Sequence, residues 1–425
     1  MATIRPFRGL RFAGVAGDLS NLVAPPYDVI SPQARAALAE QSPYNIVGIT
    51  LPESKDGDRS KYIKYGRSVA LLEEWRSSGA LELDGEPRYY RYSQKFAVPG
   101  AERTVVRTKL LATIKVEPYS NGVVLPHEQT FPKHKEDRMR ILEATRSHVE
   151  CIFGLFEDQD RSLHELIASS PAATLAQLDS GGVGHQLERF DDPAVCARIT
   201  DAMASRRVWI ADGHHRYETA LEFRERLGEK SNLIPEDFML MALCSINDPG
   251  LVILPTHRIL KSMPCTADEL RAKLAEHFEI EEVPSTKILR RIGEIAQGGG
   301  RAIGVALPGE VGLVAAVRDL DRIVEQQPGT GSVKLKRLDV SILHSFVFER
   351  ILGLKGHDFF GYTRDEAEAF ASVRDGSPAA FLMNPPTVDD MRAVAECGDF
   401  MPQKSTYYFP KLLSGLVLWS LKDFA

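Results

Sequence analysis

Apolar and polar positions alternate along the chain in two rhythms, one typical of helices and one typical of strands. Where apolar residues recur every three or four positions we predict helices, and Ser31 before Pro32 has the form of a helix start. The predicted helices are 33–40, 59–78, 136–146, 217–227, 268–278, 288–297, 340–352 and 388–397. Apolar and β-branched runs predict strands at 44–51, 88–98, 104–116, 151–157, 208–211, 238–246, 251–254, 279–283, 302–307, 313–317 and 379–383.

Short turns join several of these strands. Pro99-Gly100 opens the turn between 88–98 and 104–116, which predicts a hairpin. Asp248-Pro249-Gly250 separates 238–246 from 251–254, which predicts a second adjacent pair. The fold class is therefore predicted as α+β, with mixed, largely antiparallel sheets. We expect 1–260 and 335–425 to form the main domain, and 261–334 to form a smaller α+β insertion.

Composition narrows the class of protein. Of the 425 residues, 44% are apolar and 26% charged, which is typical of a globular chain and argues against disorder, collagen and coiled coil. The net charge of −6 argues against a protein that coats DNA. No apolar stretch reaches the roughly 18 residues of a membrane helix, and the first residues lack the apolar core of a signal peptide. Five widely spaced cysteines without a C-x-x-C pair agree with a reducing cytoplasm, where we expect the protein.

The clearest chemical signal is Asp212-Gly213-His214-His215-Arg216, between a short buried strand and a helix. A glycine at such a junction lets the backbone approach a ligand, and the first N–H groups of a helix favour an anion. Arg216 adds a fork that matches phosphate oxygens, and the two histidines add donors that titrate near pH 7. Asp212 can cap the helix, orient a histidine or hold a metal. We predict that these five residues bind phosphate; a plain turn and helix cap is the alternative.

This segment resembles the Gly-x-x-Arg phosphate loop of the ParB/sulfiredoxin superfamily, and within it the Asp-Gly-His-Thr-Arg loop of free-serine kinases. The whole chain resembles a bacterial family of domains of unknown function that is often labelled SpoOJ/ParA/ParB/RepB-like. The resembling segments are 24–31, 44–50, 126–130, 211–220, 254–258 and 401–406. The resemblance implies a ParB/sulfiredoxin-like phosphate-binding core in which Gly213 to Arg216 hold a nucleotide or pyrophosphate. Because His214 stands where sulfiredoxin has its catalytic cysteine, sulfinate reduction is not implied.

A second dense group of polar residues lies in a proline-rich loop, Pro126-His127-Glu128-Gln129-Thr130 followed by Lys133. Loops on a rigid scaffold commonly carry catalytic residues, so Glu128 is a candidate general base and His127 a candidate acid, base or ligand. Lys133 is a candidate phosphate contact. The pair His127-Glu128 begins like a zinc-protease motif, but Phe131 stands where that motif needs its second histidine. A solvated charged loop is the alternative.

Two further residues are candidates for phosphate chemistry. Asp28 follows Pro25-Pro26-Tyr27, a rigid turn, and could bind Mg²⁺ through its carboxylate or act as the base. Its alternative is an Asx-type turn before the helix at Ser31. Arg258, after a predicted strand, could form a second phosphate clamp, with a surface ion pair as its alternative.

Three functions are compatible with these residues. The favoured one is a phosphotransferase that moves a phosphoryl group from ATP, ADP or pyrophosphate, with Mg²⁺, to a small hydroxylated metabolite, with free serine as one candidate. The second is a ParB-like nucleotide-binding switch without small-molecule catalysis. The third is a metal-dependent hydrolase built on Asp212, His214, His215, His127 and Glu128. We expect a small-molecule substrate and a phosphate donor as partners and neither DNA nor a membrane; a homodimer is left open.

Overall fold

The computed structural model describes residues 1–130, 135–228, 233–356 and 358–424, and the backbone of 132–134. The chain forms two compact units. Unit 1 contains Met1–Pro126, Thr130–Val252 and Pro410–Ala425, and unit 2 contains His127–Gln129 and Ile253–Phe409. Each unit is described by itself.

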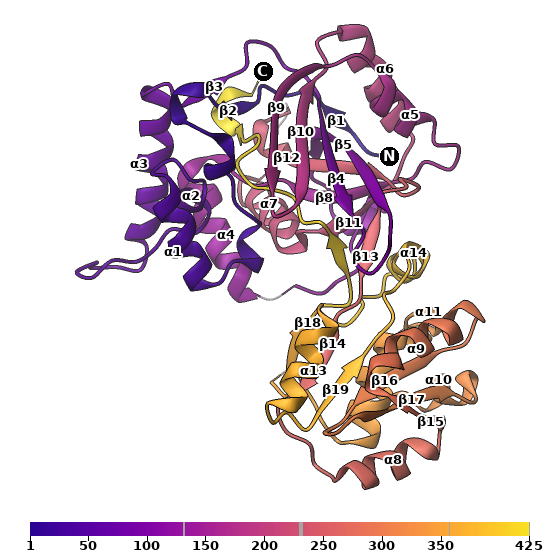
Figure 1. Ribbon diagram of the computed structural model, residues 1–425. Coiled ribbons are helices and arrows are strands. Elements are labelled where there is room, and N and C mark those ends of the chain that lie inside the picture. The colour runs from indigo at the N-terminus through magenta and orange to yellow at the C-terminus, as the bar shows by residue number, and fades with distance from the viewer. Residues whose placement is uncertain (131, 229–232, 357, 425) are drawn as a thin grey trace. The chain divides into compact units, whose positions relative to one another are not determined.

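A large sheet organises unit 1. Its strand order is β6-β11-β8-β12-β5-β4-β10-β9, and β1 lies beside β5 (Figure 1). The predicted hairpin is confirmed, because β4 and β5 pair antiparallel from Tyr90 to Ala97. The strands of the sheet are β1 (Ile4–Arg5), β4 (Tyr90–Ala97), β5 (Thr104–Lys115), β6 (Val124–Leu125), β8 (Ile152–Phe156), β9 (Ala173–Ser180), β10 (Val183–Arg189), β11 (Val208–Asp212) and β12 (Phe238–Ser245).

Three helices cover one face of this sheet (Figure 1). They are α5 (Ser162–Ser169), α6 (Pro193–Met203) and α7 (His214–Arg226). Alternate strand residues such as Leu110, Ala112 and Ile114 turn toward them and share one apolar core with Ile199 of α6 and Tyr217 of α7. This alternation is what a sheet face packed on helices requires. Two short pairs complete the strands of the unit, β2 (Leu10–Phe12) with β3 (Leu81–Leu83), and β7 (Ser147–His148) with β21 (Trp419–Ser420).

A second core of unit 1 is built from helices (Figure 1). They are α1 (Pro32–Gln41), α2 (Val47–Thr50), α3 (Ile63–Ser77) and α4 (Pro132–Thr145). The strand predicted over 44–51 is wrong, because that segment turns into α2. Asn45 is the reason: its side-chain oxygen accepts a hydrogen bond from the Val47 N–H at 3.0 Å, and its amide donates to the Val23 carbonyl at 3.2 Å. Such side-chain bonds to the local backbone favour a turn over an extended strand.

The other expected strand pair is also wrong. Strand β12 pairs with β5 and with β8, while the segment at 251–254 forms β13 (Val252–Leu254), which pairs with β20 (Tyr407–Phe409). The turn at Asp248-Pro249-Gly250 therefore ends a strand without folding the chain back onto it. Asp248 holds this turn by accepting hydrogen bonds from the N–H groups of Gly250 at 2.7 Å and Thr108 at 3.0 Å.

Unit 2 has its own sheet, in the order β15-β17-β16-β19-β14-β18. The pairs given by its register are all antiparallel. Its strands are β14 (His257–Leu260), β15 (Phe278–Pro284), β16 (Ala302–Ala306), β17 (Val311–Val317), β18 (Phe360–Thr363) and β19 (Ala379–Leu382). The predicted hairpin of 302–307 with 313–317 is confirmed by β16 and β17. The two units together bear out the α+β class with largely antiparallel sheets.

Helices lie on both faces of this smaller sheet. Ala380 and Leu382 of β19 share a core with α9 and α13, while Phe381 between them contacts Phe348 of η7, with ring centroids 4.9 Å apart. Because neighbouring strand residues point to opposite faces, these contacts place α9 and α13 on one side and η7 on the other. The helices of the unit are α8 (Ala267–Ala275), α9 (Ile288–Gln297), α10 (Leu320–Gln326), α11 (Val333–Lys336), α12 (Asp339–Ser341), the π-helical η7 (Ile342–Ile351), α13 (Glu366–Arg374) and α14 (Val388–Glu396).

The boundary of the smaller unit differs from the predicted insertion of 261–334. Residues 335–409 belong to unit 2 because β18 and β19 pair with β14, and β19 also pairs with β16. Strands that complete a sheet cannot be assigned from the sequence when their partners lie far away along the chain.

Candidate functional site

The predicted phosphate loop begins where β11 ends. Strand β11 is buried from Val208 to Ala211, and its register with β8 shifts between Ile210 and Asp212. Gly213 then takes a left-handed conformation, with φ of 96°, and caps α7. A Cβ on Gly213 would lie 2.7 Å from Cγ2 of Ile152, so only glycine fits here. The structure therefore has the strand, glycine and helix that the sequence predicted for an anion site.

Arg216 lies in the first turn of α7, and a backbone carbonyl fixes the position of its guanidinium. Its Nη1 donates to the carbonyl of Cys151 at 2.7 Å. Burial alone would lower the pKa of Arg216, but the carboxylates of Glu150 and Asp212 outweigh burial and raise it. Arg216 is thus a permanent cation with acidic neighbours.

Asp212 is paired with a residue that the sequence did not single out. Nζ of Lys411 donates to its Oδ2 at 2.7 Å, and the two side chains are 13% and 21% exposed. Burial would raise the pKa of Asp212, but the charges of Lys411 and Arg216 hold that pKa below its usual value. Asp212 is therefore ionised, and orienting cations is the role that its contacts support.

Lys411 is positioned through its backbone by a buried polar cluster on the sheet. The amide of Gln94 donates to the Lys411 carbonyl at 2.9 Å. The same Gln94 accepts hydrogen bonds from Lys109 at 2.6 Å and from Arg107 at 2.7 Å, and both side chains are fully buried. No motif marks these residues, because they come together only when segment 410–413 lies against β4 and β5.

Tyr27, in the segment that contains Asp28, lies beside two arginines, Arg138 and Arg216. Its ring centroid lies 3.8 Å from the guanidinium of Arg138 and 5.9 Å from that of Arg216. Its N–H donates to Glu150 at 3.1 Å, and burial raises the pKa of its hydroxyl to about 12. Asp28 itself is exposed, in the short helix η3 (Tyr27–Val29), and its charge acts on Arg216. The structure thus brings Asp28 to the phosphate loop.

Glu150 is the common acceptor of this part of the site. It is 3% exposed and accepts from Arg138 at 3.1 Å and from Ser414 at 3.0 Å. A pocket between α4 and α7 opens beside it, and the Nε atoms of Arg138 and Arg216, which line this pocket, have no hydrogen-bond partner in the described part of the chain. Two guanidinium groups with unused donors favour binding of an anion. The lining residues are Arg138, Ile141, Leu142, Ser147, His148, Val149, Glu150, Arg216 and Thr219.

Unit 2 brings together His127, Glu128 and Arg258. The backbone of Glu128 forms an isolated parallel β-bridge with Met401. The negative charge of Glu128 favours the protonated form of Arg258 and so raises its pKa. His127 is fully buried, with Nε2 3.0 Å from Oγ1 of Thr406. Three of the segments that the sequence singled out, 126–130, 254–258 and 401–406, therefore meet in this unit.

Arg258 is buried among neutral acceptors. It donates to Nε2 of His344 at 3.0 Å and to the carbonyls of Thr256, Gln403 and Lys404. Because Arg258 is always a donor, Nε2 of His344 must be an acceptor, so His344 is neutral. Burial lowers the pKa of Arg258 to about 10. The surface ion pair proposed as the alternative for Arg258 is wrong, since the residue is only 1% exposed.

The remaining predicted residues have these positions. His214 is buried at the start of α7 and His215 is half-buried beside it. The side chain of Lys133 lies outside the described residues. No group of three or more His, Cys, Asp and Glu side chains that could hold a metal ion occurs in the described part of the chain.

These features define a class of protein: an α+β protein with a strand–glycine–helix junction at Gly213. Residues 4–341 match the model of the family described as "Protein of unknown function (DUF1015)", and the chain belongs to that family. No curated protein sequence matches the chain. These comparisons give no support to the SpoOJ/ParA/ParB/RepB-like label, and the ParB/sulfiredoxin-like core remains a prediction.

Several solved structures are similar over much of the chain at low identity. A free serine kinase mutant in complex with ADP is 13% identical, with a TM-score of 0.35 over 73% of this chain and 92% of its own. A conserved hypothetical protein from Pyrococcus furiosus is 14% identical, with a TM-score of 0.34 over 74% of this chain and 97% of its own. SbnI from Staphylococcus aureus, truncated at its C-terminus, is 12% identical, with a TM-score of 0.35 over 72% and 86%.

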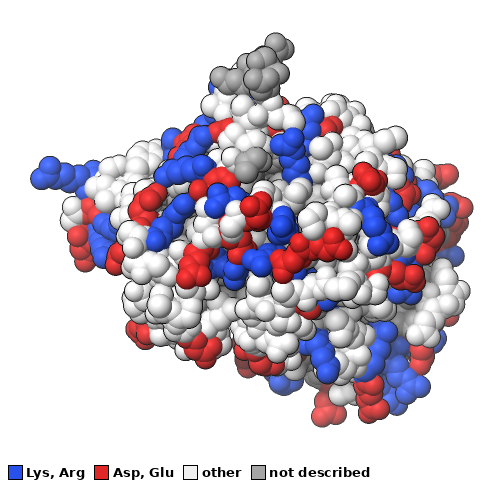
Figure 2. All heavy atoms as spheres, turned by 90° about the horizontal axis from the view of Figure 1, so that it is seen from above, with Lys and Arg blue, Asp and Glu red and all other residues white. Residues whose placement is uncertain are grey.

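Two general properties of the described residues complete the description. No helix among them is long and apolar enough to cross a membrane. On the face shown in Figure 2, Lys and Arg side chains are interspersed with Asp and Glu, and the coloured atoms form no broad basic area.

Proposed function

We propose that the protein is a phosphotransferase that moves a phosphoryl group from a nucleotide or pyrophosphate to a small hydroxylated metabolite. The observation that carries this proposal is the junction at Gly213. Its φ of 96° and the contact that a Cβ would make with Ile152 leave room for glycine alone, at the start of the long helix α7. Phosphate groups bind at such junctions through backbone N–H groups and the positive end of the helix dipole.

The side chains around Gly213 have separate roles in this proposal. Arg216 presents its guanidinium to the phosphates, and the carbonyl of Cys151 fixes its position. Asp212 orients Lys411, which adds a second cation beside the helix start. His214 and His215 contribute further donors. Phosphoryl transfer depends mainly on positioning and on neutralising charge, which a cradle of this composition provides.

A base and a metal ion complete the proposed chemistry. A carboxylate takes the proton of the acceptor hydroxyl while the acceptor oxygen bonds to phosphorus and the donor oxygen leaves with the electron pair. Glu128 and Asp28 are the two candidates from the sequence, and Asp28 is the one that belongs to the same unit as Gly213. Asp28 is exposed and close enough to act on Arg216, which fits Mg²⁺ held by one carboxylate and by phosphate oxygens. Such an ion would neutralise charge on the phosphates. His127 is fully buried, so it suits orientation of the loop better than proton transfer to a substrate.

The experiment is a binding and transfer assay on the full chain. Calorimetric titration with ATP, ADP, AMP and pyrophosphate, each with and without Mg²⁺, identifies the donor. Phosphorus NMR then follows phosphoryl transfer to a panel of hydroxylated metabolites, with serine tested first because free serine kinases are among the similar structures. We expect at least one nucleotide or pyrophosphate to bind and at least one acceptor to be phosphorylated.

Gly213→Ala has a matched control at the other end of the same helix. Gly228 also has positive φ, 68°, but a Cβ there meets nothing within 4 Å. Gly213→Ala is expected to weaken nucleotide binding at least about tenfold, and Gly228→Ala to leave it unchanged. If Gly213→Ala unfolds the protein, Arg216→Lys tests the same site, since it keeps the charge but loses the fork. Unchanged binding in the folded variant that is tested would refute the site.

A further inference from the structure

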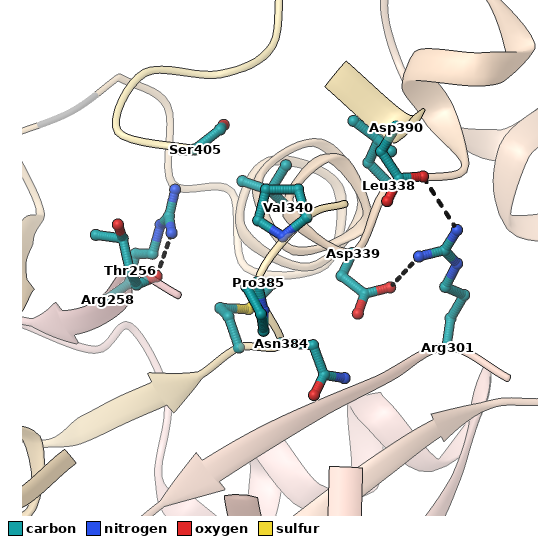
Figure 3. Close-up of a pocket in the computed structure, with 12 residues that line it drawn as sticks. Thr256, Arg258, Arg301, Leu338, Asp339, Val340, Asn384, Pro385, Asp390 and Ser405 are labelled. Carbon is teal, nitrogen blue, oxygen red and sulfur yellow. Dashed lines mark hydrogen bonds and ion pairs between the residues drawn. The ribbon is translucent and has the colours of Figure 1, made fainter. Parts of the chain in front are cut away.

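Two pockets of unit 2 differ in size and in the pairing of their charged groups. The pocket in Figure 3 is the smaller one, and its volume of about 20 Å³ has room for about one water molecule. Arg301 pairs there with Asp339 at 3.4 Å and with Asp390 at 3.7 Å (Figure 3). Asp390 also accepts from the hydroxyl of Thr387 at 2.8 Å. The polar groups of this pocket are thus partners of one another.

The second pocket is large enough for a small organic molecule. Its volume is about 370 Å³. It lies between the end of β15, the short helix η6 (Ser285–Lys287), the turn from β16 to β17 and the last turns of α13. Since an apolar cavity of about 150 Å³ already holds benzene, an aromatic ring with polar substituents fits here.

Much of the wall of this second pocket is apolar. Ala306, at the end of β16, and Val373, on α13, are 1% and 5% exposed, and both belong to the core of the unit. Leu307 and Phe370 are half-buried and also line the pocket. Protein cores leave few voids larger than a water molecule, so a cavity of this size is not explained by ordinary packing. The ring of Phe370 favours an aromatic ligand.

One polar group of the wall has no partner within the protein. Oγ of Ser285 is buried, and it forms no hydrogen bond in the described part of the chain. The N–H of Ser285 donates to the carbonyl of Glu310 at 2.8 Å, which fixes the backbone on this side of the pocket. Because buried hydroxyls are normally paired, the Ser285 hydroxyl indicates a hydrogen-bonding group that a ligand supplies.

The charged groups of the wall are Arg374, in the last turn of α13, and Glu310, and both residues are exposed. No hydrogen bond or ion pair joins Arg374 to Glu310 or to another described residue. A guanidinium matches a carboxylate through two parallel hydrogen bonds, and it is less strongly hydrated than an ammonium group. A ligand carboxylate at Arg374 is therefore favoured over a ligand ammonium at Glu310, while Glu310 disfavours a second carboxylate on the same ligand.

We propose that this second pocket binds an aromatic monocarboxylate that carries a further hydrogen-bonding group. The ring lies against Phe370 and Val373, the carboxylate binds Arg374, and the further polar group forms a hydrogen bond with the hydroxyl of Ser285. All four residues belong to unit 2, so the proposal does not depend on phosphoryl transfer at Gly213.

The test is calorimetric titration of the full chain, without nucleotide, with four molecules that share one ring. The probe with all the required groups is 4-hydroxyphenylacetate. Phenylacetate lacks the hydroxyl, 4-methylphenol lacks the carboxylate, and tyramine has an ammonium group in place of the carboxylate. We expect 4-hydroxyphenylacetate to bind at millimolar concentration or below, and each of the other three to bind at least about threefold more weakly.

Variants assign the binding to this pocket. Ser285→Ala removes only the hydroxyl, so 4-hydroxyphenylacetate should then bind no more tightly than phenylacetate. The unfolding free energy should not fall, because this hydroxyl has no partner in the free protein. Arg374→Gln should likewise remove the difference between 4-hydroxyphenylacetate and 4-methylphenol. Arg318→Gln is the matched control, because Arg318 is also exposed but does not line the pocket, and its affinity should equal that of the wild type.

Three outcomes overturn the proposal. If 4-hydroxyphenylacetate does not bind at millimolar concentration, the pocket does not hold an aromatic carboxylate. If 4-methylphenol or tyramine binds as tightly, the carboxylate is not recognised by Arg374. If 4-hydroxyphenylacetate binds to Ser285→Ala and Arg374→Gln as it binds to the wild type, its site lies elsewhere. None of these results bears on nucleotide binding, which is measured separately.

Discussion

Each unit contains an arginine that the sequence marked as a phosphate contact, half-buried Arg216 and buried Arg258, and the two have different electrostatic surroundings. Arg216 of unit 1 lies among Glu150, Asp212 and Asp28, and its pKa is raised. Arg258 of unit 2 donates to a neutral histidine and to carbonyls, and burial lowers its pKa to about 10 although the charge of Glu128 acts against this. The acidic neighbours of Arg216 outweigh the effect of burial on its pKa, whereas burial outweighs the charge of Glu128 at Arg258. Arginine in a motif therefore does not by itself tell which ligand it binds.

The largest expected effect on stability is that of Glu150→Gln, which removes an acidic neighbour of Arg216. Glu150→Gln leaves Arg138 and Arg216 facing a neutral amide in a buried position. Since breaking a buried ion pair from one side leaves an uncompensated charge, we expect unfolding free energy to fall by about 3–5 kcal/mol. Urea unfolding measures this. Glu53→Gln is the control, because Glu53 pairs with Arg35 but its side chain is 55% exposed, and about 0.5 kcal/mol or less is expected. Equal effects in both variants would show that Glu150 does not balance the arginines.

The second effect concerns pH and belongs to unit 2. The pKa of Asp339 is about 6, above its ordinary value of 3.8. The folded state therefore holds this proton more tightly, and its stabilising effect is complete below about pH 4 and lost as the pH rises through about 6. The full span is about 2–3 kcal/mol.

The variant Asp339→Asn isolates this contribution. It has no proton to lose, so stability relative to the wild type should improve as the pH rises from about 4 to about 7. His257, whose pKa burial lowers to about 4, gives the opposite slope in both proteins and cancels in the comparison. If the unfolding free energies of wild type and Asp339→Asn changed in parallel between about pH 4 and about pH 7, the raised pKa of Asp339 would be contradicted.

The smallest expected effect on stability is that of replacing Arg258. Arg258→Lys keeps a cation but cannot reach His344 and the carbonyls in their separate directions, so about 1–2 kcal/mol of stability is expected to be lost. Arg290→Lys, at a side chain that is 81% exposed, should change nothing measurable. Unfolding curves of Arg258→Lys that coincide with the wild type would mean that the fork of donors is not needed.

The elements that the sequence predicted well are those with local causes. The hairpin of β4 and β5 follows from two long alternating runs joined by Pro99-Gly100, and Gly213 follows from its place between a buried strand and a helix. The segment 44–51 was misassigned because its β-branched residues outweighed Asn45 in the prediction, whereas in the structure the side-chain bonds of Asn45 decide.

The parts of the site that the sequence did not reveal come from distant segments. Lys411 reaches Asp212 from far along the chain, and Glu150 connects Tyr27, Arg138 and Ser414. Tyr27 stood inside a segment already singled out, so a closer reading of its aromatic side chain next to two prolines could have found it. Lys411 and Glu150 have no local signal, because only tertiary packing gives them partners.

The division of the chain between the units has a consequence for the order of events during synthesis. The strands of the large sheet are complete once β12 has been made, but segment 410–424, which returns to unit 1, is made only after the whole of 253–409. Until then Asp212 lacks Lys411, and Glu150 lacks Ser414. A ribosome-bound chain that ends before 410 should therefore contain a formed sheet with an incomplete segment around Asp212, and the nucleotide binding proposed for that segment should be measurable only when the final residues are added.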